Sequence, residues 1–574
     1  MSAATQGLVR LPLWRARIVL VLLLAAFAVL VARSVYLQAM RTDFLQEKGD
    51  ARYSRIIDVP ATRGRILDRH GAALAVSTPV KSVWAIPGDT QLSRSDKARL
   101  AKLLDLDRGE LDKRLADATR DFVYLKRQLP PETADAVAAL GLAGIHQHRE
   151  FRRYYPGGEV TAHVIGFTGV DDTGQEGLEL AFERHLGARP GSRRVIKDRL
   201  GQIVEDVESI RAGQDGRDLA LSLDGKLQSL AFGALKAAVQ QHRAKAGALV
   251  ALDVRTGEIL ALANVPSFNP NNRARLTGAQ LRNRAVTDLF EPGSTLKPFT
   301  VALALESGKV TPATRVATDG GRLSIASYTI RDLHPAAALS VAQVIQKSSN
   351  VGAAKLALAM PREAMWQLYR SLGFGEAPQL GFPGAAAGRL RHHRSWRPIE
   401  QATMAYGHGI SLSLVQLARA YTVFARDGEL VPLTLVKTDS AASAEKVLST
   451  ETARAVRAML ELAVQPGGTG PRARIMGWRV AGKTGTAHKP ENGSYATDKY
   501  LASFVGFAPA SAPRLVVAVM IDEPAAGEHY GGAVAAPVFA QVMGGALRML
   551  GAPHDAPLEP VELPGEVEEL REST

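Results

Sequence analysis

The most continuous run of apolar residues lies near the start of the chain, at residues 18–32. This run is shorter than the ~20 residues that span a bilayer. It reaches that length when it is extended through Arg33 to Leu37, because a long arginine side chain can reach the interface. The pattern therefore predicts one transmembrane helix at residues 18–37, and the arginines that precede it, Arg15 and Arg17 among them, predict a cytoplasmic N-terminus.

A cleaved signal peptide is the alternative for this segment, since Ala26-Phe27-Ala28 resembles a cleavage site. The apolar character continues beyond these residues, which favours an uncleaved anchor. Both alternatives place the rest of the chain outside the cytoplasm.

A polar segment at residues 38–59 predicts a stalk, and mixed short elements follow it. A short strand and turn are expected at residues 63–71, helices at 93–115 and 131–140, and strands at 195–206. We assign residues 60–216 to one extracytoplasmic domain, a pedestal without a catalytic cluster. Its early arginines are expected to form structural ion pairs rather than a site: Arg63, Arg65 and Arg69.

From residue 217 onward, apolar strands and amphipathic helices alternate in larger blocks. Strands stand first and last and helices lie between them, which predicts an antiparallel sheet covered by helices. The expected helices are 226–242, one that follows Ser294, 339–346, 413–428 and 533–550, and the expected strands are 248–253, 258–263, 501–508 and 515–521.

The predicted fold class is therefore α+β. A transmembrane helix is followed by an elongated pedestal and a catalytic domain with an all-helical subdomain. The predicted segments are a cytoplasmic N-terminus at 1–17, an anchor at 18–37, a stalk at 38–59, a pedestal of the dimerisation type at 60–216, a catalytic domain at 217–550 and a disordered Pro/Glu tail at 551–574.

Composition narrows the range of partners. The chain has 574 residues and a formal net charge of +13, which suits nucleic acid, an anionic membrane surface or an acidic substrate. Dense runs of lysine and arginine with interleaved aromatic residues do not occur, so we expect no nucleic-acid partner. The chain contains no cysteine, which excludes disulfides, thiolate zinc sites and a cysteine nucleophile.

A serine and a lysine three residues apart, Ser294 and Lys297, follow a Pro-Gly turn and precede a run of helix formers. One helical turn would place both side chains on the same face. A serine becomes a nucleophile beside a base, and an amine of lowered pKa can be that base. A second Ser-x-x-Lys, Ser443 to Lys446, lies in a polar segment that predicts a solvated loop.

Two further short motifs follow Ser294 in order, and together they predict an acyl-transfer site. Ser348 can relay a proton to a leaving amine, and Asn350 can hold the peptide group of a substrate. Lys483 supplies positive charge for a substrate carboxylate. The remaining predicted groups are the hydroxyls of Thr484 and Thr486, the close strand approach at Gly485, and an oxyanion hole from the backbone N–H groups of Ser294 and Thr486.

Other catalytic machinery does not fit the sequence. No nucleophile elbow, zinc-binding His-Glu-x-x-His helix or phosphate-binding loop occurs. His146 and His148 are two residues apart, which would place them on different faces of a helix, so we expect surface histidines rather than a metal site. We predict a reaction without metal or cofactor.

The ordered motifs resemble those of class B penicillin-binding proteins, and especially the division-specific transpeptidases among them. The resemblance extends over nearly the whole chain. It rests on the segments Arg63–Arg69, Gly177–Glu179, Lys197–Gly201, Pro266–Pro270, Phe290–Ser294, Lys347–Gly352, Gly482–Ala487 and Tyr530–Gly532. The middle residue of the second motif, Ser349, departs from class A β-lactamases, which carry aspartate there.

The resemblance implies a bacterial inner-membrane enzyme with a periplasmic catalytic domain at the division septum. The substrates would be peptidoglycan stem peptides ending in D-Ala-D-Ala, and β-lactams would acylate Ser294. The implied partners are an FtsW-type glycan polymerase and other division proteins. An elongation-specific transpeptidase and a non-catalytic β-lactam-binding scaffold or sensor remain as alternatives.

Overall fold

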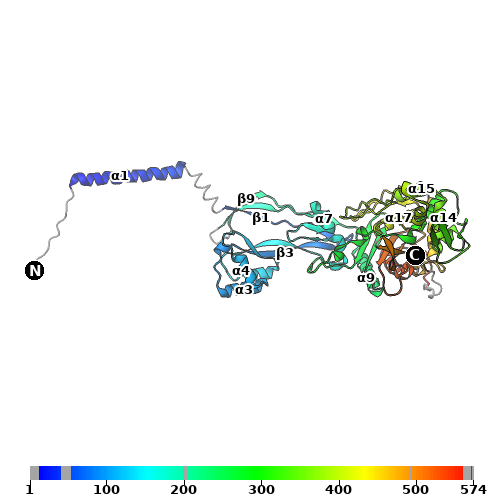
Figure 1. Cartoon of the computed structure of the whole chain (residues 1–574). Helices are drawn as coiled ribbons and strands as arrows, with labels where there is room; N and C mark the ends of the chain where they lie inside the picture. The colour runs from blue at the N-terminus through cyan, green and yellow to red at the C-terminus, as the bar shows by residue number, and fades with distance from the viewer. Residues whose placement is uncertain (1–11, 41–53, 198–202, 492, 560–570, 572–574) are drawn as a thin grey trace. The chain divides into compact units, whose positions relative to one another are not determined.

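The computed structural model describes residues 12–40, 54–197, 203–491, 493–559 and 571 (Figure 1). Contacts between residues divide the chain into two units. The first unit contains residues 1–61 and 188–215, and the second contains residues 62–187 and 216–574. Each unit is described by itself.

The first unit holds the apolar helix and a small sheet. Helix α1 (Leu13–Val35) continues as a π-turn, η1 (Tyr36–Met40), and confirms a helix over the predicted segment, although α1 begins five residues earlier. Its apolar side chains are exposed. The antiparallel sheet consists of β1 (Ser54–Val59), β8 (Gly191–Lys197) and β9 (Ile203–Arg211). Strand β1 therefore forms the last residues of the predicted stalk, whose residues 41–53 lie outside the described residues.

The second unit begins with a sheet that is covered by helices on one face. The helices α3 (Arg94–Leu104), α4 (Arg108–Leu115) and α5 (Pro131–Ala138) confirm the predicted ones and pack on the sheet through leucine, valine and alanine side chains. Ser93 begins α3 with a capping box. The strands are β2 (Ile66–Leu67), β3 (Ala73–Ala85), β4 (Val123–Leu129), β5 (Ile145–Tyr154) and β10 (Leu219–Ala220).

The two histidines of this sheet lie on β5, and here the helical expectation is wrong. Alternate residues of a strand share one face, so His146 and His148 lie on the same side. The His146 ring packs on Trp84, with ring centroids 4.6 Å apart. His148 Nε2 lies 3.0 Å from Glu150 Oε1. Both histidines are partly exposed members of an aromatic and polar surface.

The early arginines form ion pairs, as predicted. Arg63 Nε donates to Glu179 Oε2 at 2.7 Å, and Arg153 Nε donates to Glu179 Oε1 at 2.6 Å. All three side chains are almost completely buried. Arg65 pairs with Asp218 at the surface. Arg69 lies 3.4 Å from Glu258, another buried carboxylate.

Glu179 lies in a group of short elements between the first sheet and the catalytic part of the unit. Helix α6 packs on strand β12 (Ile259–Val265) of the catalytic part, and it holds the buried His163. The elements of this group are η3 (Gly158–Val160), α6 (Ala162–Ile165), β6 (Phe167–Thr168), β7 (Gly174–Glu176), α7 (Gly177–Ala181) and α8 (Glu183–Leu186).

An antiparallel five-stranded sheet organises the rest of the second unit and confirms the predicted arrangement. Its strand order is β12-β11-β21-β20-β19. The chain enters it through α9 (Gly225–Gln241), which Asp224 caps. The strands are β11 (Ala246–Asp253), β12 (Ile259–Val265), β19 (Ala481–Glu491), β20 (Ser494–Ala508) and β21 (Leu515–Asp522).

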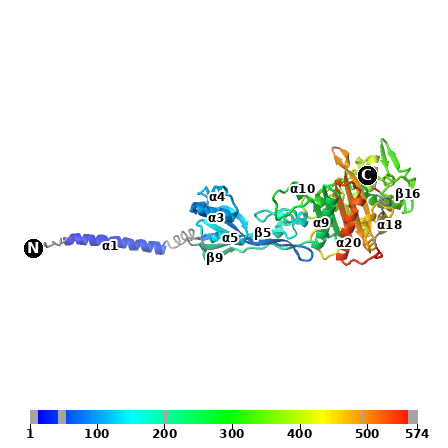
Figure 2. The same ribbon diagram turned by 90° about the horizontal axis from the view of Figure 1, so that it is seen from below.

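Both faces of this sheet are buried, so its central strands are continuously apolar rather than alternating. Leu249 and Ala251 of β11 pack into the cluster beneath α9 and α20 (Ala536–Met549). These two helices lie side by side (Figure 2). Val250 and Leu252 point to the opposite face and pack in the core that contains α17 (Leu414–Ala425).

The helices of the opposite face carry two of the three predicted motifs. The predicted helical part is not wholly helical, because β13 (Arg315–Ala317) pairs with β16 (Ala338–Ser340) and β14 (Arg322–Ile325) pairs with β15 (Tyr328–Arg331). Its helices are α10 (Gly278–Leu281), α11 (Arg284–Thr287), α12 (Lys297–Glu306), α13 (Val341–Gln346), α14 (Asn350–Leu358), α15 (Arg362–Ser371), α16 (Pro398–Met404) and α18 (Thr450–Ala463).

The predicted disordered tail begins too early, because residues just beyond 551 contact the sheet domain. Asp555 accepts hydrogen bonds from the backbone N–H of Arg479 at 2.7 Å and from the Ser511 hydroxyl at 2.7 Å. The His554 ring packs on Trp478, with centroids 4.2 Å apart. These contacts fix residues just beyond α20. Residues 560–570 and 572–574 lie outside the described residues.

Candidate active site

Ser294 lies on a 3-10 turn, η4 (Gly293–Leu296), that leads directly into α12. Lys297 is the first residue of α12, and its Nζ lies 2.8 Å from Ser294 Oγ. The predicted proximity is therefore correct, although the serine precedes the α-helix. Gly293 has φ +57°, a left-handed conformation that favours glycine. Its backbone touches Gly407 so closely that a Cβ on Gly407 would lie 2.1 Å from Gly293 O.

Lys297 joins the first motif to the second. Its Nζ lies 2.6 Å from the Ser348 carbonyl oxygen and 3.0 Å from Ser348 Oγ, and the lysine side chain is fully buried. Ser348 has φ +59°, which is uncommon for a residue with a side chain. Such strain is maintained only where the surroundings enforce it, often at functional sites. The second motif thus presents both a hydroxyl and a carbonyl to the same amine.

The rest of the second motif is held by an aspartate that the sequence analysis missed. Asp332 accepts hydrogen bonds from the Ser349 hydroxyl at 2.6 Å and from the Val351 backbone N–H at 2.9 Å. Asn350 Nδ2 lies 3.3 Å from the Arg331 carbonyl. Asn350 Oδ1 is buried and has no hydrogen-bond partner within the described part of the chain, so it can accept one from a bound substrate.

The third motif lies on β19, beside the first two. Lys483 is fully buried, and its Nζ lies 3.1 Å from Thr484 Oγ1 and 3.3 Å from Thr469 Oγ1. The two threonine hydroxyls are 2.7 Å apart. Thr469, which lies in the Gly-Gly-Thr-Gly segment 467–470, was not predicted. It orients both groups that the sequence assigns to substrate binding.

Gly485 is required by packing inside the protein. A Cβ at this position would lie 2.5 Å from Ser503 Oγ and 2.8 Å from Thr295 Cγ2. The close approach brings β19 against the 3-10 turn that holds the nucleophile. Thr486, one residue further, accepts a hydrogen bond from the Gly531 backbone N–H at 3.0 Å.

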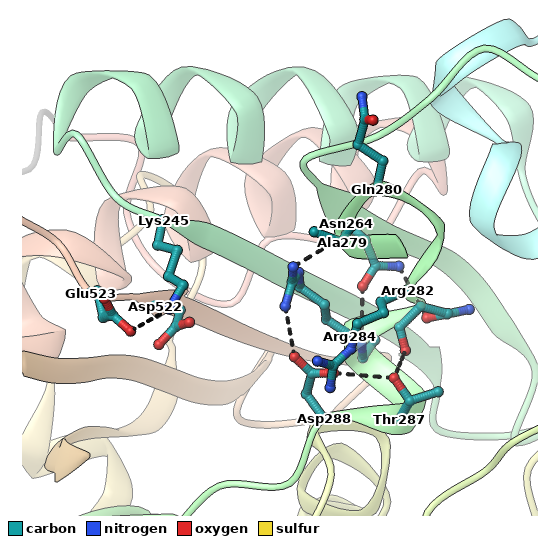
Figure 3. A network of polar contacts seen from close by, with 12 residues as sticks. Lys245, Asn264, Ala279, Gln280, Arg282, Arg284, Thr287, Asp288, Asp522 and Glu523 are labelled. Atoms are coloured by element: carbon teal, nitrogen blue, oxygen red, sulfur yellow. Dashed lines mark hydrogen bonds and ion pairs between the residues drawn. The ribbon is translucent and has the colours of Figure 1, made fainter. Parts of the chain in front are cut away.

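The segment before the nucleophile is fixed to β12 (Figure 3). Asn264 Oδ1 accepts from the Ala285 backbone N–H at 2.9 Å. Arg284 and Arg282 both pair with Asp288, at 2.9 and 2.6 Å. These bonds hold α11 and the residues that follow it, so the chain enters η4 from a fixed position.

His408 lies near Lys297. Burial lowers the pKa of His408 to about 4, so its imidazole is neutral at pH 7. The residue is partly exposed to solvent, and it packs edge-on against Tyr406, with ring centroids 5.3 Å apart. A neutral histidine adds no charge beside the base.

The other occurrences of the short motifs in the sequence lie away from this group of residues. Lys446 Nζ contacts the Asp427 carbonyl and Thr450 rather than Ser443, and Ser443 lies in a loop. The Ser-x-Asn pattern of the second motif, Ser348 to Asn350, occurs again at Ser267 to Asn269, which follows β12, and the Ser267 hydroxyl donates to the Glu159 carbonyl. The predicted site residues Ser294, Lys297, Ser348, Asn350, Lys483, Thr484, Gly485 and Thr486 lie on η4, α12, α14, β19 and the turn before α14.

Family comparisons agree with this geometry. Residues 247–544 match the family described as penicillin binding protein transpeptidase domain, and residues 58–221 match the penicillin-binding protein dimerisation domain. The chain belongs to the class B penicillin-binding proteins. It is a peptidoglycan D,D-transpeptidase by family.

Named relatives of this family cover almost the whole chain. The chain is 47% identical to the probable peptidoglycan D,D-transpeptidase PenA of Neisseria gonorrhoeae, over 95% of this chain and 94% of that protein. It is 43% identical to the peptidoglycan D,D-transpeptidase FtsI of Escherichia coli K12, over 95% of this chain and 93% of that protein.

A solved structure resembles the catalytic part of this class B protein. The apo transpeptidase domain of Burkholderia pseudomallei penicillin-binding protein 3 is 51% identical, with a TM-score of 0.55, and the match covers 59% of this chain and 98% of that one. Outside this part, residues 13–38 form a helix that is long and apolar enough to cross a membrane, which fits a single-pass anchor.

Proposed function

We propose that Ser294 is the nucleophile and Lys297 the base of peptidoglycan crosslinking. The observation that carries the proposal is the environment of Lys297 Nζ. Three of its neighbours, Ser294 Oγ, Ser348 Oγ and the Ser348 carbonyl oxygen, lie at 2.8, 3.0 and 2.6 Å. A neutral amine has one lone pair and two hydrogens, so it can accept the Ser294 proton while it donates to Ser348.

In the proposed reaction, Ser294 attacks the carbonyl between the two terminal D-alanines of a stem peptide. The backbone N–H groups of Ser294 and Thr486 stabilise the oxyanion. Ser348 passes the proton from Lys297 to the leaving D-alanine, and Asn350 accepts the substrate amide N–H. Lys483, Thr484 and Thr486 bind the terminal carboxylate. An amine of a second stem peptide then displaces Ser294 from the acyl-enzyme, and no metal or cofactor takes part.

The proposed site of action is the division septum. The named FtsI relative and the division-type motifs support a septal rather than an elongation role. We propose an uncleaved inner-membrane anchor, a cytoplasmic N-terminus and a periplasmic active site, with an FtsW-type glycan polymerase and other division proteins as partners. Depletion in the cell tests the role, because a septal enzyme leaves long undivided cells and an elongation enzyme leaves round ones.

Mass spectrometry tests the site. Treatment with benzylpenicillin should add one penicilloyl group to Ser294, and Ser294→Ala should carry no adduct. An adduct that persists in Ser294→Ala would contradict the assignment of the nucleophile. Crosslinking of lipid-linked precursor in the presence of a glycan polymerase separates a working transpeptidase from a β-lactam-binding scaffold or sensor, which would be acylated but would form no crosslinks.

A further inference from the structure

Glu291 precedes the nucleophile by three residues and has no role in the reaction described above. Its carboxylate contacts two other segments at the rim of the active site. Glu291 Oε1 accepts from the Gly409 backbone N–H at 2.8 Å, and Glu291 Oε2 accepts from the Tyr495 hydroxyl at 2.8 Å. One side chain therefore joins the nucleophile segment, the loop that contains Gly407 and Gly409, and the hairpin of β19 and β20.

We infer that Glu291 is a positioning residue that latches the β19–β20 hairpin to the nucleophile segment. The inference rests on the proposed roles of Ser294 and Lys483. Acylation requires that the nucleophile and the carboxylate-binding strand lie at a fixed separation, and small misplacements of reacting groups cost large factors in rate. Glu291 acts on this separation through Tyr495, and it does not touch the reacting atoms.

The hairpin needs such an attachment because it extends beyond the sheet. Strand β21 pairs with β20 only between Leu501 and Ala508, whereas β19 and β20 pair with each other as far as Glu491 and Ser494. The outer part is anchored on β19 by Lys489, which donates to Asp522 and Glu523 at 2.6 Å each. The Glu291–Tyr495 bond is an anchor on the other strand.

The contacts between the nucleophile segment and the loop that contains Gly407 and Gly409 are equally specific. Gly407 O accepts from the Gly293 backbone N–H at 3.2 Å, and Gly409 donates to Glu291 on the same segment. His408, between these two glycines, packs near Tyr495, with centroids 5.9 Å apart. Hydrogen bonds to a carboxylate are stronger than neutral ones. Glu291 thus provides a charged acceptor where three segments meet.

The test measures acylation by a fluorescent penicillin in stopped flow, with the rate constant of acylation separated from the dissociation constant of the initial complex. Glu291→Ala should lower the acylation rate constant about 10-fold and change the dissociation constant much less. Tyr495→Phe should lower the rate constant about 3-fold. Glu291→Gln should stay within about 2-fold of wild type, because its amide can accept from Gly409 and donate to Tyr495.

Glu491→Ala is the matched control. Glu491 lies on the same hairpin and pairs with Lys499 at the surface, so its loss should leave acylation unchanged. Faster hydrogen exchange of the hairpin in Glu291→Ala would locate the effect. Wild-type acylation in Glu291→Ala or in Tyr495→Phe would overturn the inference, as would a Glu291→Gln protein as slow as Glu291→Ala.

If Glu291→Ala does not fold, the comparison of Tyr495→Phe with Glu291→Gln decides alone. A failure of the proposed function is distinguishable from a failure of this inference. In the first case the wild-type protein itself forms no adduct on Ser294, whereas in the second the wild type and the Glu291 variants are acylated equally.

Discussion

Buried cations occur in two regions of the second unit, and their partners differ. In the pedestal, Arg63 and Arg153 share the carboxylate of Glu179, and all three side chains are almost inaccessible to water. In the active site, Lys297 and Lys483 are fully buried beside hydroxyl and carbonyl oxygens. The first arrangement fixes the charges, and the second places amines beside the groups that we propose to react.

The type of basic residue also differs between the two regions, with arginine in the pedestal and lysine in the active site. An arginine stays protonated at any accessible pH and forms planar, directional bonds with a carboxylate, which suits a structural pair. A lysine can lose its proton when it is buried, which suits a base. Substitutions of charged residues in either region therefore test whether the buried arginines are structural and the buried lysine is catalytic.

The largest expected effect is on the catalytic base. Lys297→Arg replaces the amine with a guanidinium, which stays protonated and cannot accept the Ser294 proton. The acylation rate constant for a fluorescent penicillin should fall by at least ~1,000-fold. Lys355→Arg is the control, since Lys355 pairs with Asp319 away from the site. Acylation of Lys297→Arg near the wild-type rate would show that Lys297 is not the base.

Loss of the pedestal carboxylate should affect stability instead of chemistry. Glu179→Gln leaves the buried Arg153 without its carboxylate and leaves Arg63 with Glu183 alone, which costs about 3 kcal/mol or more of unfolding free energy. Urea unfolding measures this, and acylation of the folded variant should match the wild type. Asp218→Asn, which removes the exposed partner of Arg65, should leave the urea midpoint unchanged. Equal destabilisation by both variants would remove the distinction between buried and exposed pairs.

A histidine at the contact between the pedestal and the catalytic part predicts acid sensitivity. Burial lowers the pKa of His163 to about 4, and the positive charge of Arg284 lowers it further. The hydrogen bond to the Gln280 carbonyl raises the pKa but does not offset these two effects. The Phe268 ring packs edge-on against it. The unfolded chain takes up a proton near pH 6.5, whereas the folded one does not until about pH 4, so stability falls as pH drops through this range.

Between pH 7.5 and pH 5, this group should lower the unfolding free energy by about 2 kcal/mol. Urea unfolding at the two pH values measures the total change, and His163→Gln should reduce it by that amount. An unchanged pH dependence in His163→Gln would assign the acid sensitivity to other groups.

The smallest expected effect concerns the spacing within the active site. The added methyl group of Gly485→Ala meets Ser503 and Thr295, which should push β19 away from the nucleophile turn and slow acylation about 10-fold. Gly233→Ala is the control, because a Cβ on Gly233 meets nothing within 4 Å. Equal rates in both variants would show that β19 tolerates this displacement.

The sequence determined the three motifs, the anchor helix and the antiparallel sheet, because each of these depends on local patterns. Apolar runs specify buried strands, and Ser294 and Lys297 need only one helical turn to meet. The same local reasoning was wrong for His146 and His148, because a short polar segment does not distinguish a helix from a strand. The pairing of β5 with β3 decided that.

The tertiary structure alone decided which distant groups support the site. Asp332, Thr469 and Glu291 act on the motifs through hydrogen bonds to residues 17, 15 and 204 positions away. No local pattern specifies such pairs, because they form only when the helices and the sheet pack together. Gly485 shows the same limit. The sequence predicted that Gly485 lets the strand approach a substrate closely. The structure shows that Ser503 and Thr295 also leave no space for a side chain at this position.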